Sequence, residues 1–511
     1  MEQRDDNSNS NVPIALGEGS RLKARPTPLA AATAYQHELS GIDVLFADFD
    51  LADMSHLLEL VEVGLVDSAT AKVVANGLLN LRSAGPHAVS WDPVAGDIYN
   101  NRTRHLSSAV GEQIDVIHTG RARREAATLA WHLASRRAVI EVATSTAGLV
   151  RELTATARRE SGTIAPDFTY LQRAHPTSLG HYLCGFAWPL VRDLERLSLA
   201  LDHVDASPAG SGSVNGSVLP LDRVRMAERL GFGRPVDHTR DAMWQADVGF
   251  ELASVATTAL VTVGRLAEDL FIWSTPEFSY FINADEHCRN SVIMPQKRNP
   301  YALAYLRGRA RSAAGSLNAV LATQFTTTGQ PDSRTTTYIE VPRALRETAN
   351  ALDLMGEVVN RGEFDRSRLA VAAAAEHAYA TDYCDLLTLR FGVPNGQAHR
   401  MLGRAIRSAA ESGRSFVSSE DLEVAERYLG ASIPRLDADD LDRLRDPAAI
   451  VATRNTLGGA ALAMLSDMCE KIETSVSSHM SRFDAARERF VNAEQSVVDA
   501  TTKLVNNELQ S

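Results

Sequence analysis

Apolar side chains recur every three or four positions along two long stretches of the chain. The first row is Leu129, Leu133, Ile140, Ala143, Ala147 and Val150, and the second is Leu252, Val255, Ala259, Val263, Leu266, Leu270 and Trp273. This spacing brings apolar residues onto one face of a helix, as in the helices of a bundle. Alternating patterns rich in β-branched residues, which would indicate strands, are scarce. The sequence therefore predicts an all-α fold with a long central helical bundle.

Proline is missing from long windows of the sequence that include both rows. No proline occurs between Pro93 and Pro166, between Pro235 and Pro276, or between Pro342 and Pro394. Because proline interrupts the interior of a helix, these windows leave room for very long helices. We expect a disordered terminus followed by three helical units: residues 1–20, then an N-terminal domain at 21–117, a central bundle domain at 118–370, and a C-terminal domain at 371–511 that ends in an extra helix.

The composition narrows the classes of partner. The 511 residues carry a formal net charge of -12 and no long run of Lys or Arg, which disfavours nucleic acid as a partner. No window of the sequence resembles a membrane span or a secretion signal, so we expect no membrane partner. The four cysteines are widely spaced, without a CxxC pair or a Cys/His cluster. We therefore expect no metal site, no disulfide framework and a cytoplasmic location.

Four stretches carry more polar residues than helix packing requires. They read GDIYNNRTRHL (96–106), HTGRARREA (118–126), TYLQRAHPTSLGHYL (169–183) and RNSVIMPQKRNPY (289–301), and a glycine-rich loop occupies 208–220. Each stretch alone has a structural explanation, such as a solvated helix start or a turn. Together they contain no Ser-His-Asp order, no phosphate loop and no metal-ligand spacing. They supply cationic and hydrogen-bonding groups, which suit a substrate with carboxylates.

These stretches resemble the motifs of a known enzyme family. SVIMPQKRNP is similar to the GSSxMPxKxNP signature of the fumarase/aspartase superfamily. HTGRARREA resembles the HTGRSRND segment of its argininosuccinate lyase branch, and TYLQRAHPTSLGHYL resembles that branch's THLQRAQPxxxGH. The matches follow the family's order from about residue 20 to about residue 470. The resemblance implies a homotetramer with a central twenty-helix bundle, in which segments of three subunits form each active site.

The resemblance also implies a reaction and the residues that carry it. Members of the family eliminate a group from a succinyl compound, usually release fumarate, and use no cofactor. A base removes a proton next to a carboxylate, and the resulting dianion needs preorganised hydrogen-bond donors. By position, Ser291 would be the base, and Lys297 and Asn299 would stabilise the dianion. The residues expected to bind the dicarboxylate substrate are Asn101, Arg121, Arg123, Thr169 and Arg240, with Arg121 or Arg123 holding a carboxylate through paired hydrogen bonds.

Two residues depart from the family pattern where the leaving group is handled. The branch has a His where this chain has Tyr170, and a Glu where this chain has Ala304. Since that pair protonates or orients the leaving group, the loss of both predicts a leaving group that needs no proton. Tyr170 is itself a weak acid, because the pKa of a free tyrosine is about 10. His175 is the alternative acid near the substrate.

Arg124 adds a positive charge where the branch has an Asn, which suits a more anionic substrate or one with a nitro group. We therefore predict an elimination whose leaving group is already stable as an anion, such as nitrite from nitrosuccinate. Two alternatives stay open. One is a C–N lyase that acts on argininosuccinate or another N-substituted aspartate. The other is a catalytically inactive structural homologue, which the retained Ser291, Lys297 and Asn299 disfavour.

Overall fold

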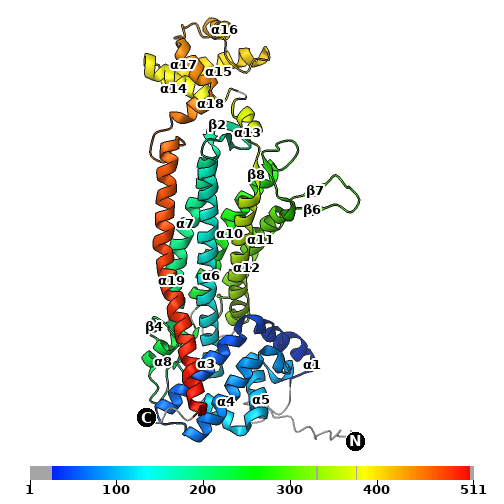
Figure 1. The fold of residues 1–511 in the computed structure, drawn as a ribbon, viewed down its shortest axis with the longest axis vertical. Helices are drawn as coiled ribbons and strands as arrows, with labels where there is room; N and C mark the ends of the chain where they lie inside the picture. The colour runs from blue at the N-terminus through cyan, green and yellow to red at the C-terminus, as the bar shows by residue number, and fades with distance from the viewer. Residues whose placement is uncertain (1–25, 245, 328, 330–331, 376, 507–511) are drawn as a thin grey trace.

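The computed structural model describes residues 26–244, 246–327, 329, 332–375 and 377–506, so the disorder predicted for 1–20 lies outside the described residues. Long helices packed side by side run along the length of the molecule (Figure 1). They are α6 (Arg123–Arg159), α7 (Leu179–Val204), α10 (Asp247–Trp273), α11 (Tyr301–Ala322), α12 (Asp332–Arg361) and α19 (Leu462–Asn506). The prediction of a mostly helical fold built around a long bundle is therefore confirmed.

Shorter helices gather at the two ends of this bundle (Figure 1). The N-terminal end holds α1 (Pro28–Ala30), α2 (Gln36–Glu38), α3 (Ile42–Glu62), α4 (Ser68–Ala84), α5 (Ile98–Val110), α8 (Arg223–Arg229) and α9 (Thr239–Trp244). The opposite end holds α13 (Arg366–Ala373), α14 (Ala380–Phe391), α15 (Asn395–Glu411), α16 (Ser419–Leu429), α17 (Ala438–Arg445) and α18 (Pro447–Ala452).

Short two-stranded sheets occur where the chain turns between helices. The longest is an antiparallel hairpin of β1 (Ile164–Thr169) and β2 (Gln172–Ser178), which follows α6. The other pairs are β3 (Ala206–Ser207) with β4 (Arg234–Pro235), which are parallel, and the antiparallel pairs β5 (Phe281–Ile282) with β8 (Glu363–Phe364) and β6 (Arg289–Asn290) with β7 (Arg298–Asn299). Two of these sheets carry predicted active-site residues.

Both predicted apolar rows are buried. Every residue of the row that begins at Leu129 and of the row that begins at Leu252 lies in the protein interior. The buried apolar residues form three separate clusters, in the long bundle, in the N-terminal helices and in the helices from α14 to α18. The one-sided pattern in the sequence therefore marks helix faces that pack against other helices.

The last helix, α19, joins two of these clusters. Its Phe483 and Phe490 belong to the core of the bundle, while Val497 and Leu504 belong to the N-terminal cluster. Polar contacts follow the same path, because Arg158 of α6 pairs with Glu473, and Arg82 of α4 pairs with Glu494. The unit predicted at 371–511 therefore has its terminal helix packed outside its own core.

Two bundle helices contain an interior proline, and one of these prolines, Pro342, was the limit of a proline-free window in the sequence. Pro189 lies inside α7 and Pro342 lies inside α12, which begins ten positions before it. An interior proline costs a helix about 3 kcal/mol. Neighbouring helices offset this cost, since Leu190 and Val191 of α7 and Val341 and Leu345 of α12 are buried in the bundle core.

Among the described residues, α10 is long and apolar enough to cross a membrane, judged by length and composition alone. The sequence had indicated no such window. Half of its most apolar window is buried inside the protein, where the helix packs against α7, α11 and α12. The bundle core therefore accounts for the buried half of this window.

A close contact between three bundle helices can be tested with a matched pair of glycines. A Cβ added at Gly180 of α7 would lie 2.5 Å from the carbonyl oxygen of Ala157 and 2.6 Å from Leu465 Cδ2, whereas a Cβ at Gly185 meets nothing within 4 Å. We expect Gly180→Ala to lower the free energy of unfolding by about 1–3 kcal/mol through overpacking. Gly185→Ala should be neutral or raise it by up to about 1 kcal/mol. Urea denaturation measures both, and equal effects would contradict this packing.

Candidate active site

Arg121 is buried at the N-terminal end of the bundle and is already paired with a carboxylate. Its guanidinium donates to Asp53 at 2.5 Å and to the Ala52 carbonyl at 3.1 Å. Asp53 also accepts a hydrogen bond from the buried Arg102 at 2.8 Å. Burial alone would raise the pKa of Asp53, but Arg121 and Arg102 hold it below the usual range. Within the chain, Arg121 therefore anchors the segment that precedes α6 onto α3.

Asn101 is also buried, and its amide organises the loop before α5. The side-chain oxygen accepts a hydrogen bond from the Asp92 N–H at 2.8 Å. The side-chain nitrogen donates to the carbonyls of Asp92, Gly96 and Asp97 at 2.9–3.1 Å. These bonds fix the turn that carries the Asp97 carboxylate. Because Asp97 lines the neighbouring cavity, Asn101 supports the shape of that cavity without lining it.

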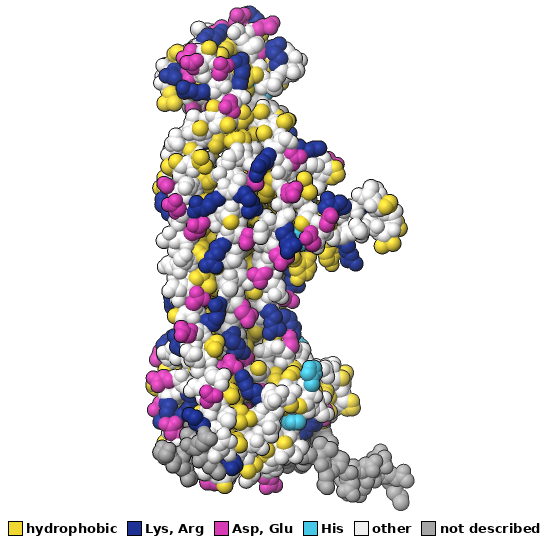
Figure 2. Space-filling model, in the orientation of Figure 1, with side chains coloured by type: hydrophobic (Ala, Val, Ile, Leu, Met, Phe, Trp, Pro, Cys, Tyr) yellow, Lys and Arg dark blue, Asp and Glu magenta, His cyan; other side chains and the backbone are white. Residues whose placement is uncertain are grey.

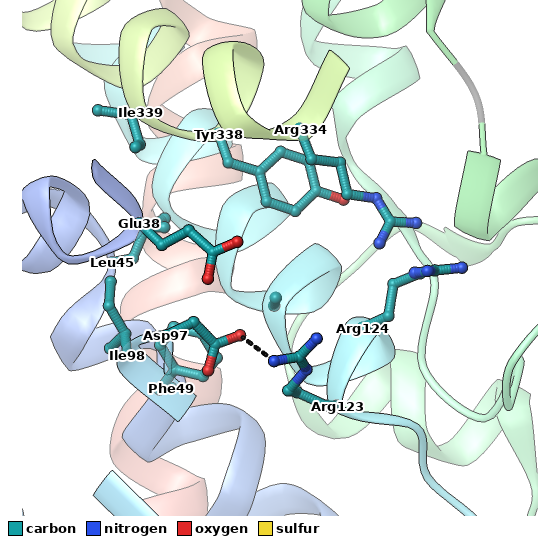
Figure 3. Close-up of a pocket in the computed structure, with 11 residues that line it drawn as sticks. Glu38, Leu45, Phe49, Asp97, Ile98, Arg123, Arg124, Arg334, Tyr338 and Ile339 are labelled. Carbon is teal, nitrogen blue, oxygen red and sulfur yellow. Dashed lines mark ion pairs between the residues drawn. The ribbon is translucent and has the colours of Figure 1, made fainter. Parts of the chain in front are cut away.

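That cavity has a volume of about 130 Å³ and lies between the N-terminal helices and the bundle. Figure 3 shows Glu38 and Asp97 from the N-terminal helices, Arg123 and Arg124 from the start of α6, and Arg334 and Tyr338 from α12 around it. Its apolar lining consists of Leu45, Phe49, Ile98, Ala127 and Ile339. Two consecutive predicted substrate-binding residues, Arg123 and Arg124, thus line this cavity.

The cavity contains charges of both signs. Arg123 pairs with Asp97 at 3.4 Å, and its side chain is more than half exposed. Burial raises the pKa of Glu38, and the nearby Asp97 carboxylate adds to this effect. The site therefore offers guanidinium groups for an anion and carboxyl groups for a cation or a hydrogen-bond donor.

Arg240 lies on α9, close to this end of the molecule. Its side chain is exposed, and its backbone N–H donates to His238 Nδ1 at 3.2 Å. The last residue of the same short helix, Trp244, stacks with Arg124 at 3.7 Å from ring centroid to guanidinium carbon. The helix α9 thus connects Arg240 to the arginine side of the cavity.

Thr169, Tyr170 and His175 lie at the other end of α6, in the β1–β2 hairpin. The 37 residues of α6 span about 55 Å at 1.5 Å per residue. Tyr170 is fully exposed at the tip of the hairpin, with a positive φ of 55°. His175 shares a hydrogen bond of 3.0 Å with Thr381 Oγ1. One chain therefore cannot bring this hairpin and the arginine cavity to the same small substrate.

A third group of predicted residues lies on the β6–β7 loop, which projects from the bundle (Figure 1). This group consists of Ser291, Lys297 and Asn299. Ser291 Oγ accepts a hydrogen bond from the Met294 N–H at 3.1 Å. The Asn299 amide donates to the Arg289 carbonyl at 2.9 Å, and Lys297 is exposed. Ala304, in the first turns of the following α11, is exposed and carries no polar side-chain atom.

The glycine-rich loop is held against the arginine segment by Glu125. This buried carboxylate accepts hydrogen bonds from the Gly210 N–H at 2.7 Å and the Gly212 N–H at 2.6 Å. On the other side, a Cβ at Gly120 would lie 2.7 Å from Leu219, so the loop also packs against the turn before Arg121. Burial raises the pKa of Glu125 to about 7. Glu125 thus joins the loop to the predicted substrate-binding segment.

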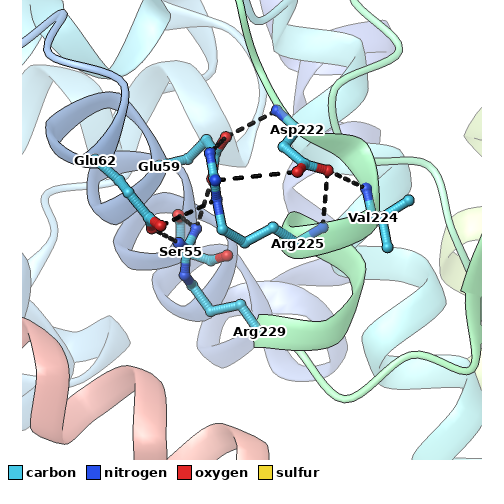
Figure 4. A network of polar contacts seen from close by, with 7 residues as sticks. All are labelled: Ser55, Glu59, Glu62, Asp222, Val224, Arg225 and Arg229. Carbon is cyan, nitrogen blue, oxygen red and sulfur yellow. Dashed lines mark hydrogen bonds and ion pairs between the residues drawn. The ribbon is translucent and has the colours of Figure 1, made fainter.

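The far end of the same loop is fixed to α3 by a second buried carboxylate (Figure 4). Glu59 accepts hydrogen bonds from Arg225 at 2.7 Å, from Arg229 at 3.0 Å and from the Asp222 N–H at 2.8 Å. Burial would raise the pKa of Glu59, yet these donors lower it below its ordinary value. An ionised Glu59 therefore fastens the start of α8 to the N-terminal helices.

Sequence motifs did not indicate Glu38, Arg334, Tyr338 or Trp244. Glu38 lies before the first polar stretch, and Arg334 and Tyr338 lie in a helix without a recognisable motif. The available signal for Arg334 and Tyr338 was a charged and an aromatic residue four positions apart, which places them on one helix face. That spacing alone is also common on solvated helices.

The comparisons with known proteins agree on one family. A family model described as "Lyase" matches residues 60–315. The argininosuccinate lyase of Methanoculleus marisnigri is 32% identical over 439 residues, covering 83% of this chain and 87% of that protein. The argininosuccinate lyase of Alkalilimnicola ehrlichii is 31% identical, covering 81% of this chain and 87% of that protein.

Solved structures show the same fold. A variant of EDDS lyase with bound fumarate has a TM-score of 0.86 and 22% identity, covering 96% of this chain and 98% of that one. The 3-carboxy-cis,cis-muconate lactonizing enzyme from Pseudomonas putida has a TM-score of 0.65 and 20% identity, covering 90% and 100% of the two chains.

The buried Glu125 predicts a pH dependence of stability. Folding raises the pKa of this group from 4.5 to about 7, so between these values the folded state binds more protons than the unfolded state. Its favourable contribution is complete below pH 4.5 and is lost as the pH rises through about 7. We expect the free energy of unfolding of the wild type to fall across this window relative to that of Glu125→Gln. Urea titrations at several pH values measure this, with Glu141→Gln on the exposed face of α6 as the control; parallel curves for all three proteins would contradict it.

Proposed function

The chain belongs to the lyase family, as a member of the fumarase/aspartase superfamily, and from this premise we propose that it releases fumarate from a 2-substituted succinate by α,β-elimination. The observation that carries the proposal is the β6–β7 loop. It carries Ser291, Lys297 and Asn299 on a hairpin that projects from the bundle, a position that supports contact with a substrate held by another subunit. Arginine residues suited to carboxylates line a separate cavity.

The proposed chemistry uses only side chains of the protein. Ser291 removes a proton from the carbon next to a carboxylate, and the electron pair moves into that carboxylate to form a dianion. Lys297 and Asn299 donate to the dianion, which then expels the leaving group with its bonding electrons and leaves a carbon–carbon double bond. A hydrogen bond from the Met294 N–H to Ser291 Oγ supports this role, because a donor stabilises the deprotonated hydroxyl. Closure of the loop over substrate would exclude water.

The leaving group we favour is one that departs as a stable anion, such as nitrite from nitrosuccinate. Tyr170 and Ala304 replace the pair that handles a basic leaving group in the argininosuccinate lyase branch, and Ala304 has no polar side-chain atom to replace that function. Arg124 adds a positive charge at the cavity. Both differences support an anionic leaving group over an amine.

A C–N lyase acting on an N-substituted aspartate, such as argininosuccinate, is the second candidate. The observation that favours it is the pair of carboxyl groups of Glu38 and Asp97 in the same cavity, because these groups suit a cation. Curated relatives named argininosuccinate lyase agree with it. An inactive structural homologue is disfavoured by the retained loop residues.

We further propose that the active form is a homotetramer with sites shared between subunits. The hairpin of Thr169, Tyr170 and His175 is separated from the arginine cavity by the length of α6, about 55 Å. The β6–β7 loop projects sideways from the bundle (Figure 1). One small dicarboxylate can therefore contact all three groups of residues only when they come from different chains.

The reaction is tested with a substrate panel read by the ultraviolet absorbance of fumarate. The panel contains nitrosuccinate, argininosuccinate, adenylosuccinate, aspartate and malate, and we expect nitrosuccinate to be turned over best. Ser291→Ala should lower kcat about 10²–10⁴-fold, the usual contribution of a positioned general base. Ser477→Ala, on an exposed face of α19, is the matched control. Rapid turnover of argininosuccinate would favour the second candidate, and an unchanged rate in Ser291→Ala would exclude the serine base.

Sites shared between subunits predict that two inactive variants regain activity when both are present in one tetramer. Ser291→Ala and Arg124→Met change different proposed parts of one site, so mixed tetramers should contain some sites with both wild-type residues. We expect fumarate formation after the two proteins are unfolded and refolded together, at a rate above that of either alone. Activity that stays at the level of the separate variants, in tetramers verified by light scattering, would show that each site comes from a single chain.

A further inference from the structure

Two arginines at the cavity are held by the same indole ring. The guanidinium carbon of Arg124 lies 3.7 Å from the centroid of the Trp244 ring, and that of Arg334 lies 4.3 Å from it. Arg334 also donates to the Met243 carbonyl at 2.7 Å. Stacking on an aromatic face stabilises a cation and fixes its plane. Trp244 therefore holds Arg124 and Arg334 each in a fixed orientation at the cavity, in spite of their like charges.

Among the described residues, no carboxylate lies within ion-pair distance of either arginine. Asp97 pairs with Arg123 instead, at 3.4 Å. Burial lowers the pKa of Arg334 to about 10, and the nearby Arg124 and Arg123 charges contribute to this decrease. Partly buried cations without a counter-charge are costly, and a bound anion would remove that cost.

The surrounding groups keep the two arginines in place and add to the positive potential. Tyr338 stacks on Trp131 at 5.4 Å, and its hydroxyl shares a hydrogen bond of 2.7 Å with Thr128. The helix α6 begins just before Arg124. Its N-cap residue is Ala122, so no side chain caps the N–H groups of its first turn. The uncapped N–H groups of its first turn favour a nearby negative charge. The side of the cavity formed by Arg124, Arg334 and the start of α6 is thus rigid, cationic and rich in hydrogen-bond donors.

We propose that Arg124 and Arg334, stacked on Trp244, bind an oxyanion group carried on carbon 2 of the substrate. The substrate class is then a succinate with a planar, negatively charged or nitro substituent at that carbon. This inference rests on the proposed elimination and makes its substrate class more specific. A free inorganic oxyanion has the same chemistry, so the experiment separates the two sources.

The test measures binding, without turnover, by isothermal titration calorimetry. The probes are ethane-1,1,2-tricarboxylate, a succinate with a carboxylate at carbon 2, and methylsuccinate, which has a neutral group there. We expect the wild type to bind the tricarboxylate at least about tenfold more tightly, the effect of one additional charge-assisted hydrogen bond. Arg334→Met and Arg124→Met should each lose this preference. Arg407→Met, on the exposed face of α15, should keep it.

Further variants separate positioning from direct binding. Trp244→Phe retains an aromatic face and should keep most of the preference, whereas Trp244→Ala should lose it while its melting temperature stays near that of Trp244→Phe. A preference absent from the wild type, or retained in Arg334→Met, would overturn the proposal. Arginine-dependent binding of inorganic phosphate that leaves both succinates bound equally would also overturn it and assign the site to a free anion. Because no fumarate is formed in these titrations, failure of the proposed elimination would appear only in the substrate panel.

Discussion

One uninterrupted helix separates two groups of the predicted substrate-binding residues of this protein. Because α6 runs for 37 residues and packs against α3, α7, α12 and α19, it fixes the separation between its two ends. Arg123 and Arg124 lie where it begins, and the hairpin with Tyr170 follows where it ends. A flexible connection would have allowed these parts to fold back onto one another within a chain. A rigid helix forbids this, which is why the proposed function includes sites shared between subunits.

At the N-terminal end, buried charged side chains join the segments around the cavity, in addition to the apolar contacts there. Asp53 lies between Arg102 and Arg121, and Glu125 and Glu59 hold the two ends of the glycine-rich segment. For the buried ion pairs of Asp53 with Arg102 and Arg121, removing one partner costs about 3–5 kcal/mol, because the other charge stays buried without compensation. These contacts therefore specify one arrangement of loops that carry no regular secondary structure. The exposed Arg123 and the stacked Arg124 are left to face the cavity.

The helical fold was predictable because burial on one face leaves a regular trace in the sequence, as in the row from Leu252 to Trp273. The arrangement around the cavity was not predictable in the same way. Arg121 was expected to hold a carboxylate, and its partner in the chain is Asp53, 68 positions away, which no local spacing indicates. Arg334 and Trp244 likewise meet only through packing of α9 against α6 and α12. The roles of Ser291, Lys297 and Asn299 remain predictions, since their loop does not meet the other groups within one chain.

The path of α19 has a consequence for the order in which the protein is made. Glu494, near its end, pairs with Arg82, which is 412 positions earlier in the chain. At synthesis rates of about 5–20 residues per second, the ribosome needs roughly 20–80 s to add the intervening residues. During that time the N-terminal core lacks Val497 and Leu504, and Cys184 lacks its buried neighbour Cys469. The apolar surface that α19 covers therefore stays exposed on the nascent chain until this helix has been synthesised.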